Sequence, residues 1–306
     1  PMKVMSPLLL ALALSGPALA APPADVPAAI WSDPPADPAF PASGVAIQIP
    51  SGGQLMNAML YLPAGRGPHP IAILMHGLPG NEQNLDLAQV MRRAGWAVVT
   101  FHYRGSWGSA GAFSLEGIGD DSMAVMDWVH MSAATRNYRL DPARVAVLGH
   151  SMGGYAAAYA CAHTPSVLGC GLIAPWDISA DQPVIAKMTP AERDAFAAAN
   201  LNDIDGRITG MTAREIAEQI ATEGQQWKLA DFAPALANRP VLVVTDTRDD
   251  DNDKALALMP ALAAAKAKKV QAVTLDSDHG SNDHRVALQI LVLKWLATLP
   301  AAPPLK

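Results

Sequence analysis

The pentapeptide Gly149-His150-Ser151-Met152-Gly153 holds the residue types in this sequence that most directly indicate chemistry. It follows an apolar run typical of a buried strand and precedes an Ala-rich segment typical of a helix. A sharp turn from strand to helix would hold the Ser151 hydroxyl clear of the backbone, where it can act as a nucleophile. The two flanking glycines remove side chains that such a turn would crowd. The motif therefore predicts a nucleophilic serine at the carboxyl end of a sheet strand.

A second motif, His76-Gly77-Leu78-Pro79-Gly80, follows another short apolar run. A carbonyl group attacked by Ser151 would develop negative charge on its oxygen, and two hydrogen-bond donors would stabilise that charge. One expected donor is the backbone N–H of Met152, beside the nucleophile. The other is the N–H of Leu78, because Pro79 has none. We expect the histidine that opens this motif to bond locally and brace the loop.

Alternating strands and helices are expected around these motifs. The expected strands are residues 45–49, 55–62, 71–75, 96–101, 145–148, 170–174, 241–245 and 270–275. The expected helices are residues 86–94, 117–131, 152–161 and 288–299. Strands separated by helices imply right-handed crossovers and a mostly parallel sheet. Residues 178–229 break the alternation, and the capping patterns at Thr189 and Thr212 predict helices there. We interpret this insertion as a helical lid.

Composition excludes several classes of protein. The chain has 306 residues, of which 50% are apolar and 16% charged, against roughly 25% charged in average proteins. Half the residues can therefore enter a core, which excludes disorder over the whole chain. The net charge is −6, and the densest basic stretch is only Lys266-Ala267-Lys268-Lys269. We expect no nucleic-acid partner, because neutralising phosphates requires larger clusters of cations.

The N-terminal residues 1–20 are typical of an export signal. Lys3 supplies a positive charge, residues 8–14 are apolar, and Ala18-Leu19-Ala20 offers small residues for cleavage. The apolar run is too short to span a bilayer, so we expect no stable membrane insertion. Residues 21–43 contain seven prolines and predict a linker that packs along the surface or stays mobile. The folded domain is expected at 44–300, in a periplasmic or secreted protein.

Cys161 and Cys170 are the two cysteines of the chain. In an oxidising compartment an even number of cysteines suggests a disulfide, here Cys161–Cys170. Two buried thiols, one on a helix and one on a strand, are the alternative. Metal binding is not expected from two cysteines without a pair of histidines.

The order of these features resembles the α/β-hydrolase superfamily: a strand, His-Gly, Tyr103-Arg104-Gly105, the Gly-x-Ser-x-Gly turn, and a late Asp and His. Within it, the chain resembles the prolyl-oligopeptidase-like and carboxylesterase-like serine hydrolases, over roughly Val45 to Leu299. The resemblance implies an α/β fold with a mostly parallel eight-stranded sheet, helices on both faces and a small helical lid. It also implies that the second strand is antiparallel and that a catalytic triad follows the order Ser, Asp or Glu, His.

That order leaves His279 and His284 as the possible bases among the eight histidines, and it argues against His76. His279 lies just past the last expected strand, where a loop can bring its ring to Ser151. His284 is expected to cap the last helix or to contact Asp283.

The acid of the triad is expected in the loop after residue 245, which holds five acidic residues between 246 and 253. The family pattern places it at Asp249, with Asp246, Asp250 and Asp177 as alternatives. It would fix the tautomer of the catalytic histidine. The other carboxylates fit a solvated loop, and no calcium-binding spacing with a central Gly and a final Glu is present, so no metal is expected.

Aromatic residues near the site have two possible roles. We expect Arg104 to hold neighbouring loops through planar hydrogen bonds, whereas Tyr103 or Trp107 could face the substrate. Trp176, at the start of the lid, could line a pocket for the acyl or leaving group or could belong to the core.

Two classes of function fit these observations. The first is an exported serine hydrolase that cleaves a small-molecule ester or amide through an acyl-enzyme and needs no cofactor. We favour a carboxylesterase over a peptidase, because the lid has only scattered glutamates rather than a pair that would anchor an amino terminus. The second class is a non-catalytic binding protein on a hydrolase fold. Such a protein typically lacks a triad residue, whereas all three types are present here.

Overall fold

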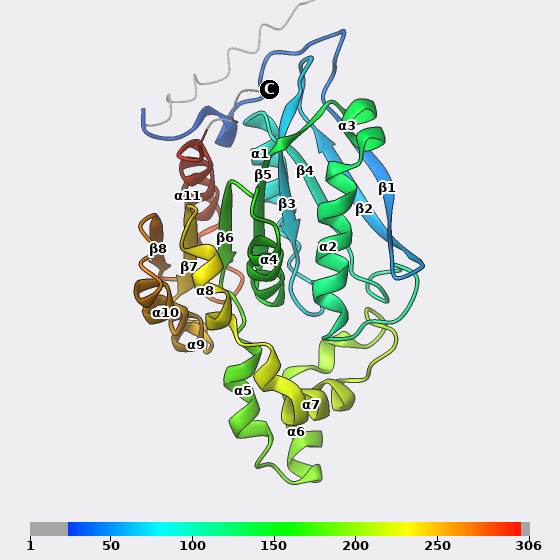
Figure 1. Cartoon of the computed structure of the whole chain (residues 1–306), viewed down its shortest axis with the longest axis vertical. Coiled ribbons are helices and arrows are strands. Elements are labelled where there is room, and N and C mark those ends of the chain that lie inside the picture. Colours follow the sequence, from blue (N-terminus) through cyan, green and yellow to red (C-terminus); the bar gives the residue numbers. More distant parts are fainter. Residues whose placement is uncertain (1–23, 301–306) are drawn as a thin grey trace, which may run out of the picture.

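An eight-stranded sheet in the order β1-β2-β4-β3-β5-β6-β7-β8 forms the centre of the structure (Figure 1). The structure is a computed structural model and describes residues 24–300. The strands are β1 (Ser43–Ser51), β2 (Gln54–Leu62), β3 (His69–Met75), β4 (Ala97–Phe101), β5 (Leu140–His150), β6 (Gly169–Ile173), β7 (Val241–Asp246) and β8 (Val270–Leu275). Strand β2 is antiparallel to both its neighbours, and β3 to β8 pair in parallel. The fold implied by the resemblance is therefore confirmed.

Two layers of helices cover the two faces of this sheet (Figure 1). Along β3, Ile71 and Ile73 join one apolar core with helices α2 (Gly117–His130) and α4 (Met152–His163). The alternate residues Ala72 and Leu74 join a second core with α1 (Leu85–Arg93) and α11 (Arg285–Ala297). All seven residues of β3 are buried, as expected for a central strand whose successive side chains enter opposite cores.

Three helices of the insertion lie beyond the carboxyl ends of the strands (Figure 1): α5 (Ile178–Ile185), α6 (Pro190–Asn200) and α7 (Ala213–Glu223). Helices α6 and α7 each begin with a capping box. Thr189 pairs with Glu192 and Thr212 with Glu215, as the sequence pattern predicts. The sequence therefore carried explicit start signals for these helices.

Three short helices have no counterpart among the sequence predictions: α3 (Ser132–Tyr138), α9 (Asn252–Leu256) and α10 (Leu258–Ala264). Each is at most seven residues long. Fewer than two turns give too little apolar periodicity to be recognised in a sequence. The four-residue helix α8 (Ala233–Leu236) connects the insertion to β7.

The described part of the Pro-rich segment, residues 24–42, packs along the surface. The Arg93 guanidinium donates to the backbone oxygen of Ala29 at 2.6 Å, and Gly65 N–H donates to Phe40 O at 2.9 Å. Ala29 is buried against the core that contains α1 and α11. The expected export signal, residues 1–20, lies outside the described residues. In residues 24–300, no helix is long and apolar enough to cross a membrane.

The cysteines correct one expectation. Cys161 on α4 and Cys170 on β6 are both buried free thiols, not a disulfide. The Cys170 thiol donates to Ala157 O at 3.6 Å, and burial raises its pKa well above the usual value. Both residues pack as small apolar side chains where α4 crosses the sheet, which is the alternative interpretation of the pair.

Candidate active site

Ser151 lies at the turn between β5 and α4, with φ 58° and ψ −124°. Non-glycine residues rarely adopt a positive φ, so the turn is strained. Two backbone hydrogen bonds hold it: Ser151 N–H donates to Ile173 O at 3.0 Å, and Trp176 N–H donates to Ser151 O at 3.0 Å. Both partners belong to β6 and the residues that follow it, so the neighbouring strand fixes the serine.

The glycines of the turn are required by close backbone contacts. A Cβ atom at Gly149 would lie 1.8 Å from Gly153 O, and one at Gly153 would lie 2.1 Å from Met75 O. Both contacts are far shorter than real Cβ contacts and involve backbone atoms that cannot move aside. The glycines therefore let α4 begin directly against β3 and β5.

His279 and Asp249 form a pair on the loops that follow β8 and β7. The Nδ1–H of His279 donates to Asp249 Oδ2 at 2.8 Å, and the Asp249 side chain is only 6% exposed. Burial alone would raise the pKa of Asp249, but the hydrogen bond and charge of His279 hold it below the usual value. An ionised acceptor at Nδ1 leaves the lone pair of a neutral His279 on Nε2, the atom a proton-accepting base needs.

The other candidate acids have other partners. Asp246 is fully buried and accepts hydrogen bonds from Ser281 Oγ at 3.0 and 3.2 Å. Asp177 caps α5 through the Ser179 N–H. Asp250 is exposed, and His284 contacts Asp283 at 3.2 Å rather than any residue of the turn. Of these acids, Asp249 is the one that binds His279.

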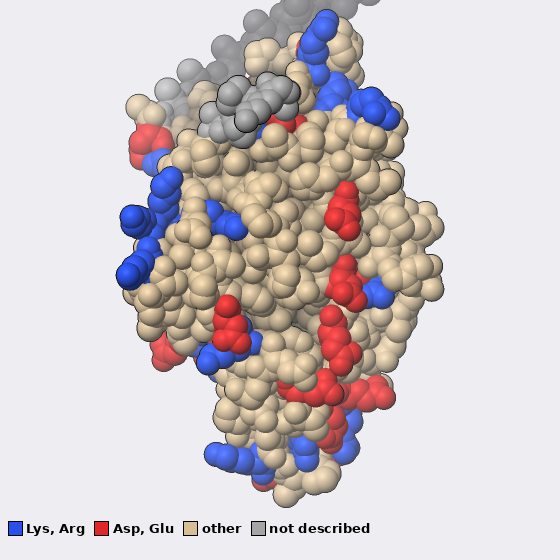
Figure 2. Space-filling model, viewed as in Figure 1, with Lys and Arg blue, Asp and Glu red and all other residues tan. Residues whose placement is uncertain are grey.

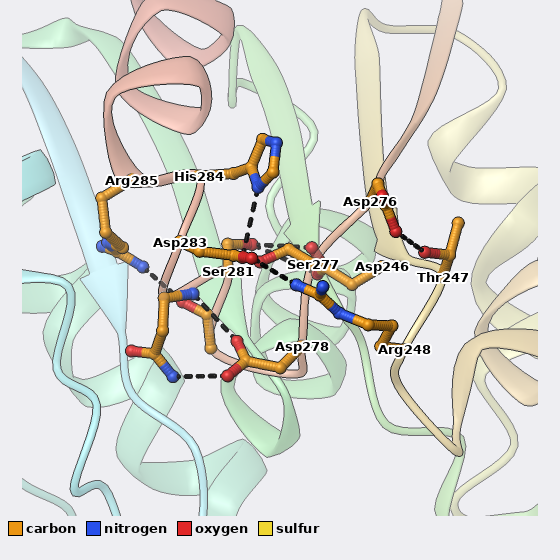
Figure 3. A network of polar contacts seen from close by, with 12 residues as sticks. Asp246, Thr247, Arg248, Asp276, Ser277, Asp278, Ser281, Asp283, His284 and Arg285 are labelled. Carbon is orange, nitrogen blue, oxygen red and sulfur yellow. Dashed lines mark hydrogen bonds and ion pairs between the residues drawn. The ribbon is translucent and has the colours of Figure 1, made fainter.

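A polar network holds the loop that carries His279, residues 276–285 (Figure 3). Thr247 Oγ1 donates to Asp276 at 2.8 Å, and Arg248 and Ser277 both bind Asp283. Downstream of the histidine, Arg285 donates to Gly280 O at 2.8 Å. The loop is thus attached both to the β7 loop and to α11, which keeps the ring of His279 over the sheet edge.

The backbone of the His76–Gly80 loop touches Ser151. A Cβ atom at Gly77 would lie 2.9 Å from Ser151 Cβ and 3.3 Å from its Oγ. His76 Nδ1–H donates to Gly77 O at 2.7 Å. The Gly77 carbonyl and the Leu78 N–H belong to one planar trans peptide and point in opposite directions, so this bond fixes where the Leu78 N–H points. Burial lowers the pKa of His76 to about 3, so the ring is a permanent neutral donor.

Met152 supplies the second expected oxyanion donor. It is the first residue of α4, so its N–H has no carbonyl one turn earlier in the helix to bind. The positive end of the helix dipole adds to this donor. The local geometry is thus suited to stabilise negative charge beside Ser151.

Three aromatic side chains donate hydrogen bonds to the His76–Gly80 loop. Tyr103 is 1% exposed and its hydroxyl donates to His76 O at 3.4 Å. Trp107 Nε1–H donates to Pro79 O at 2.6 Å, and His102 Nδ1–H donates to His76 Nε2 at 3.2 Å. The expectation that Tyr103 contacts substrate is therefore corrected: a buried ring braces the loop instead.

Trp176 and Arg104 also have structural partners. Trp176 Nε1–H donates to Asp181 at 2.7 Å and the ring packs on the core, so it does not line the cavity beside Ser151. Arg104 binds the buried Asp121 through Nε at 2.5 Å and through its backbone N–H at 2.9 Å. It holds neighbouring loops together, as expected from its planar donor group.

A cavity of about 250 Å³ brings Ser151 and His279 together. The other lining residues are Gly77, Leu78, Pro79, Gly80, Asn81, Glu82, His150, Asp203, Gly280 and Asn282. Among the described residues, no hydrogen bond joins the Ser151 hydroxyl to His279 or to any other residue, so the two side chains are linked only through the cavity that they both line. Four larger hollows, of about 710, 690, 490 and 280 Å³, include neither residue. The hollow of about 490 Å³ adjoins the cavity, because both are lined by Asn81, Glu82 and Asn282.

Sequence reasoning missed the polar walls of this cavity. Asn81 and Glu82 directly follow the His76–Gly80 motif, so continuity along the chain could have indicated them. Asp203 comes from the lid, where Asn81 Nδ2–H donates to it at 2.5 Å, and no local signal marks it. In residues 24–300, no group of three His, Cys, Asp or Glu side chains is arranged to hold a metal ion.

The chain belongs to the alpha/beta hydrolase family, whose model matches residues 72–288. It is 29% identical over 117 residues to lysophosphatidylserine lipase ABHD12 of Danio rerio, covering 36% of this chain and 29% of that protein. An uncharacterised protein of Mycobacterium tuberculosis is 29% identical over 130 residues, covering 35% of this chain and 44% of that protein. The chain therefore matches less than half the length of these relatives.

Solved structures share the fold at lower identity. Est1E from Butyrivibrio proteoclasticus has a TM-score of 0.61 and 21% identity, covering 83% of this chain and 98% of Est1E. Pyrococcus horikoshii acylaminoacyl peptidase has a TM-score of 0.61 and 15% identity, covering 87% of this chain and 43% of the peptidase. At these identities, both likenesses show the fold alone.

Replacing Gly153 by Ala is expected to cost about 3 kcal/mol of unfolding free energy or more, because the new methyl would overlap the backbone of β3. Gly53→Ala is the control: no atom lies within 4 Å of the added Cβ, and the positive φ of 75° at Gly53 adds a backbone strain that helical Gly153 does not have. It is expected to cost about 1 kcal/mol. Urea unfolding measures both, and equal losses would contradict the steric account.

The pKa of His279 is raised above 6.5, because the hydrogen bond and charge of Asp249 outweigh the lowering effect of burial. Asp249→Asn removes the largest raising effect and leaves the burial, so the pKa is expected to fall below that of the wild type. The exposed neighbour gives the control, Asp250→Asn, which is expected to leave it unchanged. NMR titration of the ring protons checks both variants.

The raised pKa of His279 also makes the free energy of unfolding depend on pH. Because the folded-state pKa of His279 exceeds the unfolded value, its contribution is complete below about pH 6.5 and is lost as pH rises through the raised pKa. Asp249→Asn should remove this decline from the stability–pH curve.

Proposed function

We propose that the protein is a serine hydrolase that cleaves carboxylic esters through a Ser151–His279–Asp249 triad. One observation carries the proposal: the Asp249–His279 hydrogen bond of 2.8 Å orients an imidazole that lines the same cavity as a serine on a strained strand-to-helix turn. Support comes from membership of the alpha/beta hydrolase family and from a relative named as a lipase.

The mechanism follows from the position of each donor. Ser151 Oγ attacks the ester carbonyl while its proton passes to His279 Nε2, and Asp249 stabilises the resulting imidazolium. The carbonyl oxygen becomes an oxyanion that accepts hydrogen bonds from the Leu78 and Met152 N–H groups. The C–O bond to the alcohol then breaks, and the leaving alkoxide takes the proton from His279. Water attacks the acyl-enzyme by the same steps and releases the acid.

The alternative is an amidase or peptidase with the same triad. The structural likeness to an acylaminoacyl peptidase supports it. Three glutamates of the lid give no support to a peptidase, because Glu192 and Glu215 are used in capping boxes and Glu218 binds Arg193 and Arg214. None of these three is available to anchor a peptide amino terminus. Turnover of a phenyl ester and its matching anilide separates the two functions.

The cavity favours a small, polar substrate. Its volume of about 250 Å³ is below the roughly 300–1,000 Å³ of pockets for drug-sized ligands. Its walls carry the carboxylates of Glu82 and Asp203 and the amides of Asn81 and Asn282, and no Lys or Arg lines it. On the outer surface, acidic side chains form a column over α2 that reaches the lid (Figure 2). We infer a short acyl group and a leaving group that is neutral or cationic rather than anionic.

Residues 1–20 support a location outside the cytoplasm for this activity, because they combine a charge, a short apolar run and a small-residue cleavage pattern. No metal or cofactor enters the proposed mechanism.

Ser151→Ala is expected to lower turnover of p-nitrophenyl acetate by at least about 10⁴-fold, because no other group can form the acyl-enzyme. It should also abolish labelling by a fluorophosphonate probe. The control is Ser132→Ala, at an exposed helix start, which is expected to retain both signals. An unlabelled but fully active wild-type protein would exclude the serine mechanism, and an inactive wild-type protein would favour a binding role.

Acetylthiocholine and its uncharged isostere 3,3-dimethylbutyl thioacetate test the charge of the cavity. The cation is expected to have a kcat/KM roughly fivefold higher, the effect of one nearby charge in water-like surroundings. Asp203→Asn should reduce this ratio, whereas Asp205→Asn, which does not line the cavity, should preserve it. The ratio should fall at high salt, and a ratio of one for the wild type would refute the inference about charge.

A further inference from the structure

His150 lies between the two segments that carry Ser151 and His279. It is 4% exposed, and its Nε2 lies 2.7 Å from the backbone oxygen of His279, a residue 129 positions away. The two rings are also in contact, with centroids 4.8 Å apart and planes tilted by 51°. A carbonyl oxygen only accepts hydrogen bonds, so Nε2 of His150 must carry a hydrogen.

The other ring nitrogen agrees with this tautomer. Nδ1 of His150 is buried and has no hydrogen-bond partner among the described residues, as expected for a nitrogen without a hydrogen. Burial lowers the pKa of His150 to about 3, so its ring stays neutral, whereas the pKa of His279 is raised by Asp249. His150 therefore donates one fixed hydrogen bond and does not compete for the proton that His279 would accept.

We propose that His150 is a positioning residue that sets the placement of His279 relative to Ser151. The inference rests on the proposed function of this triad. His150 is joined to Ser151 by a peptide bond, so its hydrogen bond connects the turn of the nucleophile directly to the backbone of the base.

The other contacts at His279 hold its ring and the backbone that follows it, but do not connect it to Ser151. Asp249 holds the Nδ1 side of the ring, and Arg285 holds the next peptide through Gly280 O. Neither of these residues belongs to β5 or to the Ser151 turn. The bond from His150 adds that connection, so it controls the gap that the proton of Ser151 must cross.

Two substitutions separate the hydrogen bond from the ring. In His150→Gln the side-chain amide nitrogen reaches the former position of Nε2 and can still donate to His279 O. In His150→Asn the amide nitrogen stops at the former position of Nδ1, so the bond is lost. We expect His150→Asn to lower kcat for p-nitrophenyl acetate by roughly 10- to 100-fold with little change in KM, because small misplacements of reacting groups cost that much. His150→Gln should stay within about threefold of the wild type.

The pH profile separates positioning from proton transfer. Since Asp249 still pairs with His279, the midpoint of the kcat/KM profile should be unchanged in His150→Asn while its plateau falls. An unchanged kcat in His150→Asn, an equal loss in both variants, or an effect on KM alone would each overturn the proposal. Circular dichroism and thermal unfolding establish that both variants are folded.

The wild-type protein provides a test that needs no variant. Nitrogen-15 NMR should show His150 with its hydrogen on Nε2 and no titration between about pH 5 and 9. A hydrogen on Nδ1, or protonation in that range, would overturn the proposal even if His150→Asn did not fold. A failure of the proposed function can be distinguished from this outcome. In that case the wild-type protein shows no Ser151-dependent turnover, while the NMR result for His150 is unaffected.

Discussion

The positive φ of Ser151 is the constraint on which the rest of the site depends. A non-glycine residue with a positive φ stores backbone strain of order 1–3 kcal/mol. This conformation persists only where contacts with the surrounding structure enforce it. Here β6 supplies those surroundings through the Ile173 oxygen and the Trp176 N–H. The parallel sheet then brings the loops after β3, β7 and β8 to the same edge as the serine. The fold thus gathers the proposed donors, base and acid from distant parts of the sequence around one turn.

Burial gives three histidines near this turn different charge behaviour. His76 and His150 are buried without a carboxylate partner, and burial lowers the pKa of each to about 3. Both serve as neutral donors to backbone carbonyls, at Gly77 and His279. His279 has Asp249 beside it, and its pKa is raised instead. The carboxylate of Asp249 therefore distinguishes the imidazole whose pKa is raised from the two whose pKa burial lowers.

The sequence predicted the parts of this arrangement that depend on local patterns. The glycines around Ser151, the apolar central strands and the capping boxes at Thr189 and Thr212 are local signals, and each element has the predicted type. The pairing of Asp249 with His279 needed the chain order of a known superfamily, because the acidic loop alone left several choices. Features that depend on packing between distant segments were not accessible. The orientation of Tyr103 and the state of the two cysteines were therefore predicted wrongly or left open.

The contacts of the lid also depend on packing between distant segments, and they form one wall of the cavity. Asp203 binds Asn81, Arg207 O accepts from the Trp107 N–H at 2.8 Å, and the Trp107 ring nitrogen binds Pro79 O. These three bonds join lid residues 203–207 to the C-terminal end of the loop that carries the Leu78 N–H, at Pro79 and Asn81. Displacing this part of the lid would therefore disturb the expected oxyanion donor as well as the cavity wall. In the proposed mechanism, substrate specificity and transition-state stabilisation are therefore coupled, because residues that line the cavity also brace the loop that would bind the oxyanion.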